Sequence, residues 1–289
     1  MPDTASRSRR KRDGANVALN LWGILVYAFL FVPILVIVVY SFNDGRILAA
    51  WDGFGTNAYV HAFHNDVMKS SIITSLKAAV GTAVLATIVG TLGGIALARA
   101  GRRALWAVGL TAILAISLVT PEIVDAIAML PWFVSLGVDG GISPLNNGLV
   151  RLVLAHTVES MAVVTFIVRA RMAGVDQVLE EAAGDLYAPP WRRFKDITLP
   201  MAAPGILAGA LMAFTLSMDN TIVASFVQQP GHTPWPVYIF SQVRVALRPE
   251  VAALSSVMLV LTLAALAVVG LVLRRSGDST SDVVKTMTG

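Results

Sequence analysis

Four carboxylates lie inside or directly beside long apolar stretches of the chain: Glu122, Asp125, Glu159 and Asp219. A charge at the centre of a bilayer costs on the order of 3 kcal/mol, so such residues usually pair with a polar group or line a path for a polar solute. Against these four acids, Lys77 and His156 are basic groups within the apolar stretches. This excess of acids predicts a cavity that attracts a cation. The structural alternative is that some acids lie near span ends or make only hydrogen bonds, and that Asp219 pairs with Lys77 or His156.

Other chemical motifs are weak. His61 and His64 are three residues apart, as metal ligands on a helix could be, but no third ligand is evident and surface histidines are the simpler interpretation. None of the five lysines follows the glycine that a phosphate-binding loop requires. Any ATP hydrolysis would therefore belong to another chain. The chain has no cysteine and no Ser/His/Asp motif, although a membrane enzyme can assemble its site from distant spans.

The composition is that of a membrane protein. Of 289 residues, 56% are hydrophobic and 14% are charged, and the mean hydropathy is +0.71. The net charge of +4 is therefore no sign of nucleic-acid binding. Apolar runs predict an all-α integral membrane fold of six spans, with the third broken at Pro121. The expected spans are about 21–42, 72–98, 104–138, 149–168, 203–227 and 251–273.

Basic residues fix the expected orientation. The first 20 residues, the 99–103 turn, the 169–195 loop and the tail carry 5, 3, 5 and 3 of the 22 lysines and arginines, which is 16 in all. The positive-inside rule places these segments in the cytoplasm. We expect a cytoplasmic tail over 1–20, a permease domain over 21–275 and a cytoplasmic tail over 276–289. The first span has no small-residue cleavage pattern after it, so we interpret it as retained.

A polar segment, 174–200, separates the fourth and fifth spans. Its apolar residues recur at helical spacing from Val175 to Leu186, and its acids lie on the opposite face. Asp176 is a candidate N-cap, and Pro189 predicts the end of the helix. A second short helix is expected from Trp191 to about Ile197, and Pro200 opens the next apolar stretch.

This segment resembles the EAA loop of permeases from bacterial ABC importers. Glu181-Ala182-Ala183 is followed after thirteen residues by Ile197-Thr198-Leu199-Pro200, in the family's spacing. Tyr187 replaces the family's glycine, and Pro189 and Pro190 are expected to supply the turn instead. The resemblance implies a coupling helix that docks on an ATPase subunit. The implied coupling residues are Glu180, Glu181, Ala182, Ala183, Asp185, Tyr187, Leu199 and Pro200.

A narrower resemblance covers about residues 20–275. The segments Phe214-Thr215-Leu216-Ser217-Met218-Asp219, Val32-Pro33-Ile34-Leu35 and Pro249-Glu250-Val251 resemble spermidine/putrescine permeases of the PotC type. Asn220 stands where that family often has a second aspartate. The expected substrate pathway comprises Glu122, Asp125, Glu159, Asp219 and Asn220.

The resemblance implies a MetI-like permease fold in the bacterial cytoplasmic membrane. It further implies a related permease as partner, an ATPase dimer that binds ATP and magnesium, and an extracytoplasmic substrate-binding protein. No cofactor or nucleic acid is expected on this chain itself. An ABC permease for another small solute, an ion-coupled secondary transporter and a membrane enzyme are the alternatives.

Overall fold

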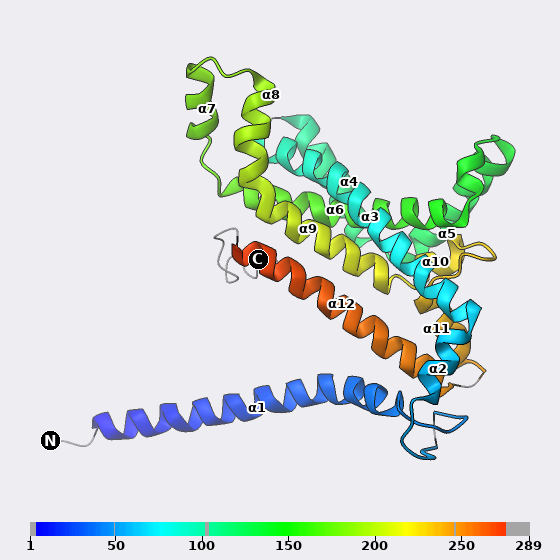
Figure 1. Ribbon diagram of the computed structural model, residues 1–289. Coiled ribbons are helices and arrows are strands. Elements are labelled where there is room, and N and C mark those ends of the chain that lie inside the picture. The colour runs from blue at the N-terminus through cyan, green and yellow to red at the C-terminus, as the bar shows by residue number, and fades with distance from the viewer. Residues whose placement is uncertain (1–3, 49, 102–103, 246, 276–289) are drawn as a thin grey trace. The chain divides into compact units, whose positions relative to one another are not determined.

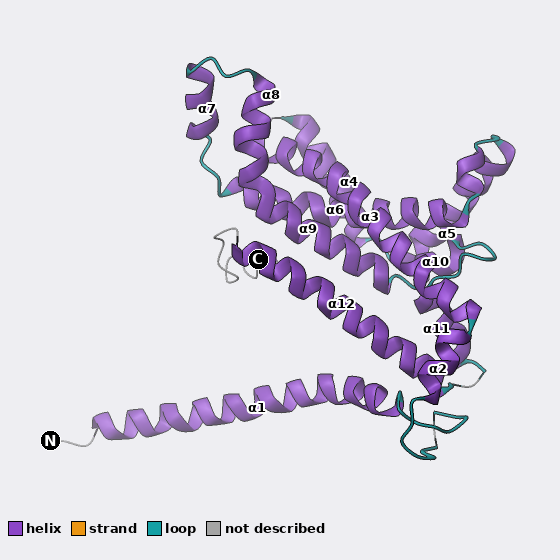
Figure 2. Ribbon diagram, in the orientation of Figure 1, coloured by secondary structure: helices purple, strands orange, loops and turns teal. Residues whose placement is uncertain are grey.

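The computed structural model describes residues 4–48, 50–101, 104–245 and 247–275. Contacts divide the chain into two units, one of Met1–His64 with Ala246–Leu259 and one of Asn65–Val245 with Val260–Gly289. In Figure 2, most of each unit is helical, and loops connect successive helices.

The first unit contains α1 (Thr4–Tyr40), α2 (Asn57–His64) and the start of α12 (Pro249–Arg275). Helix α1 continues through the basic segment, so it is longer than the span expected from hydropathy alone. The loop after α1 folds around the buried side chain of Asn43. Its amide nitrogen donates to the Ala50 carbonyl at 2.6 Å, and its oxygen accepts from the Asp52 N–H at 3.0 Å.

The second unit contains most of the helices (Figure 1). In chain order they are α3 (Asp66–Arg99), α4 (Leu105–Val119), α5 (Glu122–Val134), the π-helical turn η1 (Ser135–Asp139), the 3₁₀ turn η2 (Ser143–Asn146), α6 (Gly148–Ala173), α7 (Val178–Asp185), α8 (Pro190–Arg193), the π-helical turn η3 (Phe194–Thr198), α9 (Leu199–Asp219), α10 (Ile222–Val227) and α11 (Trp235–Val243).

The described helices give five to six candidate spans, and the expected six are reached when one bent pair is counted as a single span. Within the described residues, five helices are long and apolar enough to cross a membrane, and a bent pair of helices gives a sixth. That pair is α4 with α5, which meet at an angle of 106°. The bend lies at Thr120 and Pro121, where the proline ring forbids continued helix. The predicted break at Pro121 is therefore confirmed.

Helices α3, α6 and α9 form the packed centre of this unit. Glycines allow the close approach. A Cβ atom on Gly90 would lie 2.6 Å from the Val164 Cβ of α6, and one on Gly94 would lie 2.7 Å from the Thr165 carbonyl oxygen. On α9, a Cβ on Gly209 would lie 2.9 Å from a Val164 methyl group. Small residues thus let the backbones pack tightly where no hydrophobic effect drives helices together in lipid.

The fifth span differs from the prediction. Residues 203–227 were expected to form one helix, but α9 ends at Asp219 and α10 begins at Ile222. Asn220 is buried and has an extended backbone. Its side-chain oxygen accepts from the N–H groups of Val223 and Ala224 at 3.1 and 3.3 Å. The amide therefore satisfies the free donors at the start of α10, as a helix cap does, and the break follows.

Candidate functional site: a coupling segment and an acidic pocket

The segment between α6 and α9 contains the amphipathic helix that was predicted. Helix α7 starts at Val178, and its N-cap is Gln177 rather than the expected Asp176. The Asp176 carboxylate, one residue earlier, accepts from the Val178 N–H at 3.0 Å. The helix ends at Asp185, before the two prolines. Figure 1 shows α7 and α8 beyond the end of the bundle at which α9 begins.

The turn after α7 is formed by Tyr187 itself, and the expectation that Pro189 and Pro190 supply it is wrong. Tyr187 has a φ of 59°, the left-handed conformation that normally favours glycine. Its N–H donates to the Gly184 carbonyl at 2.9 Å, and the N–H of Ala188 donates to the Ala183 carbonyl at 3.0 Å. These two bonds are those of a Schellman cap. The tyrosine thus adopts the geometry for which the resembling family uses glycine, and the residue is 94% exposed.

Helix α7 buries none of its own residues in the part of the chain that the structure describes. Its apolar face is open, with Val178 and Leu179 exposed, and Leu186 is 81% exposed just after the helix. Glu181, Ala182 and Asp185 are also exposed, whereas Ala183 is partly buried. An amphipathic helix gains its stability mainly from packing its apolar face. Because the described residues leave this face exposed, it is available to a partner.

Glu180 differs from its neighbour Glu181. Its Oε1 atom accepts from the Arg99 guanidinium at 2.7 Å and from the Thr198 hydroxyl at 2.8 Å. Arg99 is the last residue of α3, and Thr198 is the last residue of η3, directly before α9. The expected coupling residue Glu180 thus binds within the chain and joins three elements. Sequence patterns did not single out Arg99 or Thr198 as its partners, because 81 and 18 residues separate them from Glu180.

The second expected short helix runs into the fifth span without a break. Helix α8, η3 and α9 follow one another from Pro190 to Asp219. Leu199 and Pro200 lie in the first turn of α9, where the missing N–H of proline costs little. This end of the segment is therefore continuous with the start of a span.

Three of the predicted pathway acids meet in one open cavity of about 520 Å³, here called the acidic pocket. Glu122 and Asp125 come from the first turn of α5, and Glu159 comes from the middle of α6. The bend between α4 and α5 brings the start of α5 to this place. The described residues that line the pocket include no lysine, arginine or histidine: Ser117, Leu118, Thr120, Pro121, Glu122, Ile123, Asp125, Glu159, Val163, Leu216 and Ile222.

The position of Glu122 and Asp125 at the start of α5 partly stabilises their negative charges. Carboxylates in the first turn of a helix interact favourably with the positive end of its dipole, which supports the structural alternative for Glu122 and Asp125. Glu159 has no such support, because it lies within α6. Its Oε2 atom accepts a hydrogen bond from the Asn220 amide at 2.5 Å. Asn220 thus both breaks the fifth span and holds the Glu159 carboxylate.

Asp219 occupies a different place from the one predicted. It is the last residue of α9 rather than the centre of a span, and it is exposed. It does not belong to the lining of the acidic pocket, although Leu216 and Ile222 on either side of it do. The break at Asn220 explains this, because it turns the chain just after Asp219.

The predicted partners of Asp219 are placed elsewhere. His156 is buried in the centre of the bundle, and its Nδ1 atom lies 2.7 Å from the Ser217 hydroxyl, with which it shares a hydrogen bond. Ser217 in turn donates to the Thr82 hydroxyl at 3.4 Å. The histidine therefore links α6, α9 and α3. Lys77 is exposed on α3.

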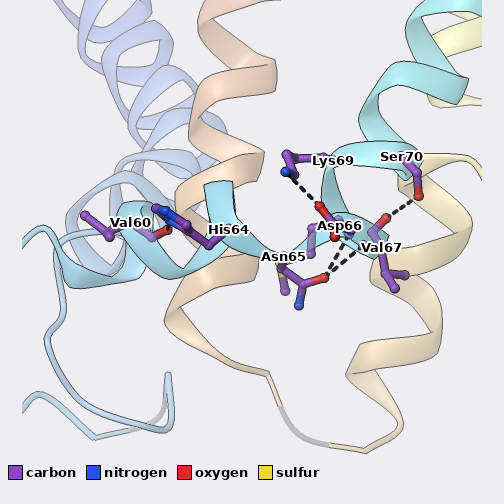
Figure 3. A network of polar contacts seen from close by, with 8 residues as sticks. Val60, His64, Asn65, Asp66, Val67, Lys69 and Ser70 are labelled. Carbon is purple, nitrogen blue, oxygen red and sulfur yellow. Dashed lines mark hydrogen bonds and ion pairs between the residues drawn. The ribbon is translucent and has the colours of Figure 1, made fainter.

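Among the described residues, no group of three His, Cys, Asp or Glu side chains that could hold a metal ion is found around His61 and His64. The Nδ1 atom of His64 shares a hydrogen bond with the Val60 carbonyl of its own helix at 2.7 Å (Figure 3). Figure 3 also shows Asn65 at the start of α3, where its side-chain oxygen accepts from the Val67 and Met68 N–H groups. These contacts are structural.

Comparison with known proteins gives the family. Residues 90–278 match the family described as "Binding-protein-dependent transport system inner membrane component". The chain is 37% identical over 247 residues to the putrescine transport system permease protein PotI of Escherichia coli K12, which covers 84% of this chain and 87% of that protein. It is also 37% identical over 257 residues to the spermidine/putrescine transport system permease protein PotC of Haemophilus influenzae, with 89% and 96% covered.

The fold has solved counterparts. A chain from the crystal structure of a bacterial alginate ABC transporter, in complex with an alginate pentasaccharide-bound periplasmic protein, aligns with a TM-score of 0.74. The alignment covers 93% of this chain and 96% of that chain, at 15% sequence identity. The predicted all-helical permease fold is thus confirmed. The chain belongs to the binding-protein-dependent transport system inner membrane components: it is a multi-pass ABC transporter permease, a transport subunit rather than an enzyme.

Proposed function

We propose that this permease forms one half of the translocation pathway of an ATP-driven importer for linear polyamines such as putrescine and spermidine. The observation that carries the proposal is the acidic pocket, in which carboxylates from α5 and α6 line one cavity and no basic residue is found among its described lining residues. PotI and PotC, which bear putrescine and spermidine in their names, support the same substrate class.

The chemistry suits a primary ammonium group. A carboxylate accepts charge-assisted hydrogen bonds from an ammonium, and these are about twice as strong as neutral ones. Glu159 would hold one ammonium, with Asn220 fixing the orientation of its carboxylate. Glu122 and Asp125 would attract a second ammonium of a linear diamine. Asp219, exposed just outside the pocket lining, would attract the cation as it enters or leaves.

The exposed apolar face of α7 supports the proposed ATPase contact. Val178 and Leu179 on that face, followed by Leu186 and Tyr187, would fill a groove on an ATPase subunit that carries ATP and magnesium. Ala182 is small and exposed, so it permits close approach. We further propose a related permease, an ATPase dimer and an extracytoplasmic binding protein as the other parts of the complex. The termini and α7 would then face the cytoplasm of a bacterium.

Alternating access would follow from these parts. ATP binding closes the ATPase dimer, α7 moves with it, and the spans rock about the central cavity. Because α8, η3 and α9 are continuous, the motion reaches α9, whose far end at Asp219 and Asn220 adjoins the acidic pocket.

The test is a set of charge-neutralising variants in the complete complex, reconstituted into vesicles with its binding protein. Glu159→Gln keeps the size of the side chain but removes its charge. We expect uptake of labelled putrescine to fall about 10- to 100-fold, since a hydrogen bond to a charged group is worth about 1.5–3 kcal/mol. Asp139→Asn, at the exposed end of η1, is the matched control and should keep wild-type uptake. Unchanged putrescine uptake by Glu159→Gln would remove the acidic pocket from the pathway.

A further inference from the structure

Two adjacent glutamates of α7 have different surroundings. Glu181 is exposed, and its side chain makes no hydrogen bond or ion pair with the described part of the chain. Glu180 is partly buried, with its side chain 23% exposed, and the Arg99 side chain that contacts it is 19% exposed. The two residues are of one type and lie next to each other, so the difference is one of position on the helix.

The Glu180 contact is stronger than an ordinary surface ion pair. Exposed pairs contribute little because water screens them and because long side chains must be ordered. Here both partners are shielded, and a second donor, the Thr198 hydroxyl, binds the same carboxylate oxygen at 2.8 Å. The Thr198 side chain is itself buried, at 5% exposure. Removing one of two shielded donors from a carboxylate therefore costs more stabilising free energy than breaking an exposed ion pair does.

Helix α7 has few other attachments to the spans. It buries none of its residues, and its ends are joined to α6 and α8 by short irregular segments around Gly174 and Tyr187. The carboxylate of Glu180 therefore supplies a fixed point between α7, the end of α3 and the start of α9. Without it, α7 would retain its connections along the chain but lose its defined position beside α3.

We infer that Glu180 is a positioning residue that makes α7, the end of α3 and the start of α9 move as one body when α7 is displaced. The inference rests on the proposed coupling function for its consequence in transport, but the linkage itself is a property of this chain. Arg99 and Thr198 are its other two members. In this arrangement Glu181 faces the ATPase partner, whereas Glu180 faces the spans.

The linkage is tested first by amide hydrogen exchange, measured for the wild type and for each variant both in the assembled complex and on the purified permease. Glu180→Ala should raise the exchange rates of the α7 and η3 amides about fivefold or more, because local opening no longer breaks the ion pair and the hydrogen bond. The matched control Glu181→Ala should leave these rates as in the wild type when measured on the purified permease. Equal rates in Glu180→Ala and wild type would overturn the inference.

Swapping the charges of residues 99 and 180 tests whether the ion pair itself, rather than either side chain alone, holds α7 in place. Arg99→Glu alone should raise the same exchange rates, and the double variant Arg99→Glu with Glu180→Arg should restore them to within about twofold of wild type. Failure of the double variant to recover would also overturn the inference. If Glu180→Ala does not fold, the comparison of Arg99→Glu with the double variant still decides the question.

The functional consequence is read as substrate imported per ATP hydrolysed. In Glu180→Ala, the ATPase should still co-purify, while this ratio falls about fivefold; in Glu181→Ala, the ATPase should be lost from the complex. Loss of the ATPase from Glu180→Ala would instead make Glu180 a docking residue and refute its positioning role. If the wild-type complex imports no polyamine while the variants change hydrogen exchange as described, the proposed function is refuted and the linkage stands.

Discussion

Replacement of Gly90 by alanine should destabilise the permease by about 2 kcal/mol. The added Cβ would lie 2.6 Å from the Val164 Cβ, 2.7 Å from its Cγ1 and 3.1 Å from the Met161 carbonyl oxygen. Carbon atoms prefer separations of about 3.5–4.0 Å, so α3 and α6 must part by roughly 1 Å. The Val164 Cβ is fixed to its backbone and cannot rotate away. Overpacking of this kind costs about 1–3 kcal/mol.

The matched control for this substitution is Gly109→Ala on α4, where a Cβ would meet nothing within 4 Å. Alanine is favoured over glycine in a helix by up to about 1 kcal/mol, so this variant should be equal to or more stable than wild type. Reversible unfolding of both variants in detergent micelles measures the difference. Gly90→Ala with the stability of Gly109→Ala would contradict the close packing of α3 on α6.

Three further predictions follow from the coupling segment and the expected orientation. Tyr187→Gly should slow hydrogen exchange at the end of α7 by about twofold to fivefold, because a left-handed conformation costs a non-glycine residue about 1–2 kcal/mol and the freedom of glycine in the unfolded chain offsets part of that gain; faster exchange would refute the strain at Tyr187. Ala182→Trp should abolish ATPase co-purification, while Ser143→Trp in η2 should not; a stable complex with Ala182→Trp would contradict docking through α7. A cysteine in place of Ser143 should react with an impermeant thiol reagent from outside the cell and one in place of Ser6 should not, whereas the reverse pattern would invert the proposed orientation.

Span positions could be predicted well from the sequence. Apolar runs of sufficient length located the spans, and Pro121 located the break in the third, because both signals are local. The end of α7 before Pro189 and the contact of Asp176 at its start could also be predicted, because these signals are local too. Hydropathy could not reveal the break at Asn220, since the flanking residues on both sides are apolar and the asparagine acts through side-chain bonds to the backbone.

The features that could not be predicted from the sequence depend on contacts between residues far apart in the chain. The sequence placed Glu180 and Glu181 on one polar face and gave no reason to separate them, because the partner Arg99 belongs to a different span. Likewise, the acids of α5 and α6 could be identified as candidates but not assembled, since the angle between α4 and α5 brings them to one pocket. At Tyr187, residue type suggested that a proline must form the turn, whereas the helix cap imposes a left-handed conformation on the tyrosine.

The most direct test of the account is uptake by the wild-type complex of this permease, its partner permease, the ATPase and the binding protein in sealed vesicles. We expect labelled putrescine or spermidine to accumulate only when ATP and the ATPase are both present, and unlabelled polyamines to compete where a neutral sugar does not. Accumulation of a neutral or anionic solute, with no uptake of polyamines, would contradict the proposed substrate. Polyamine uptake driven by an ion gradient without the ATPase would contradict the proposed mechanism.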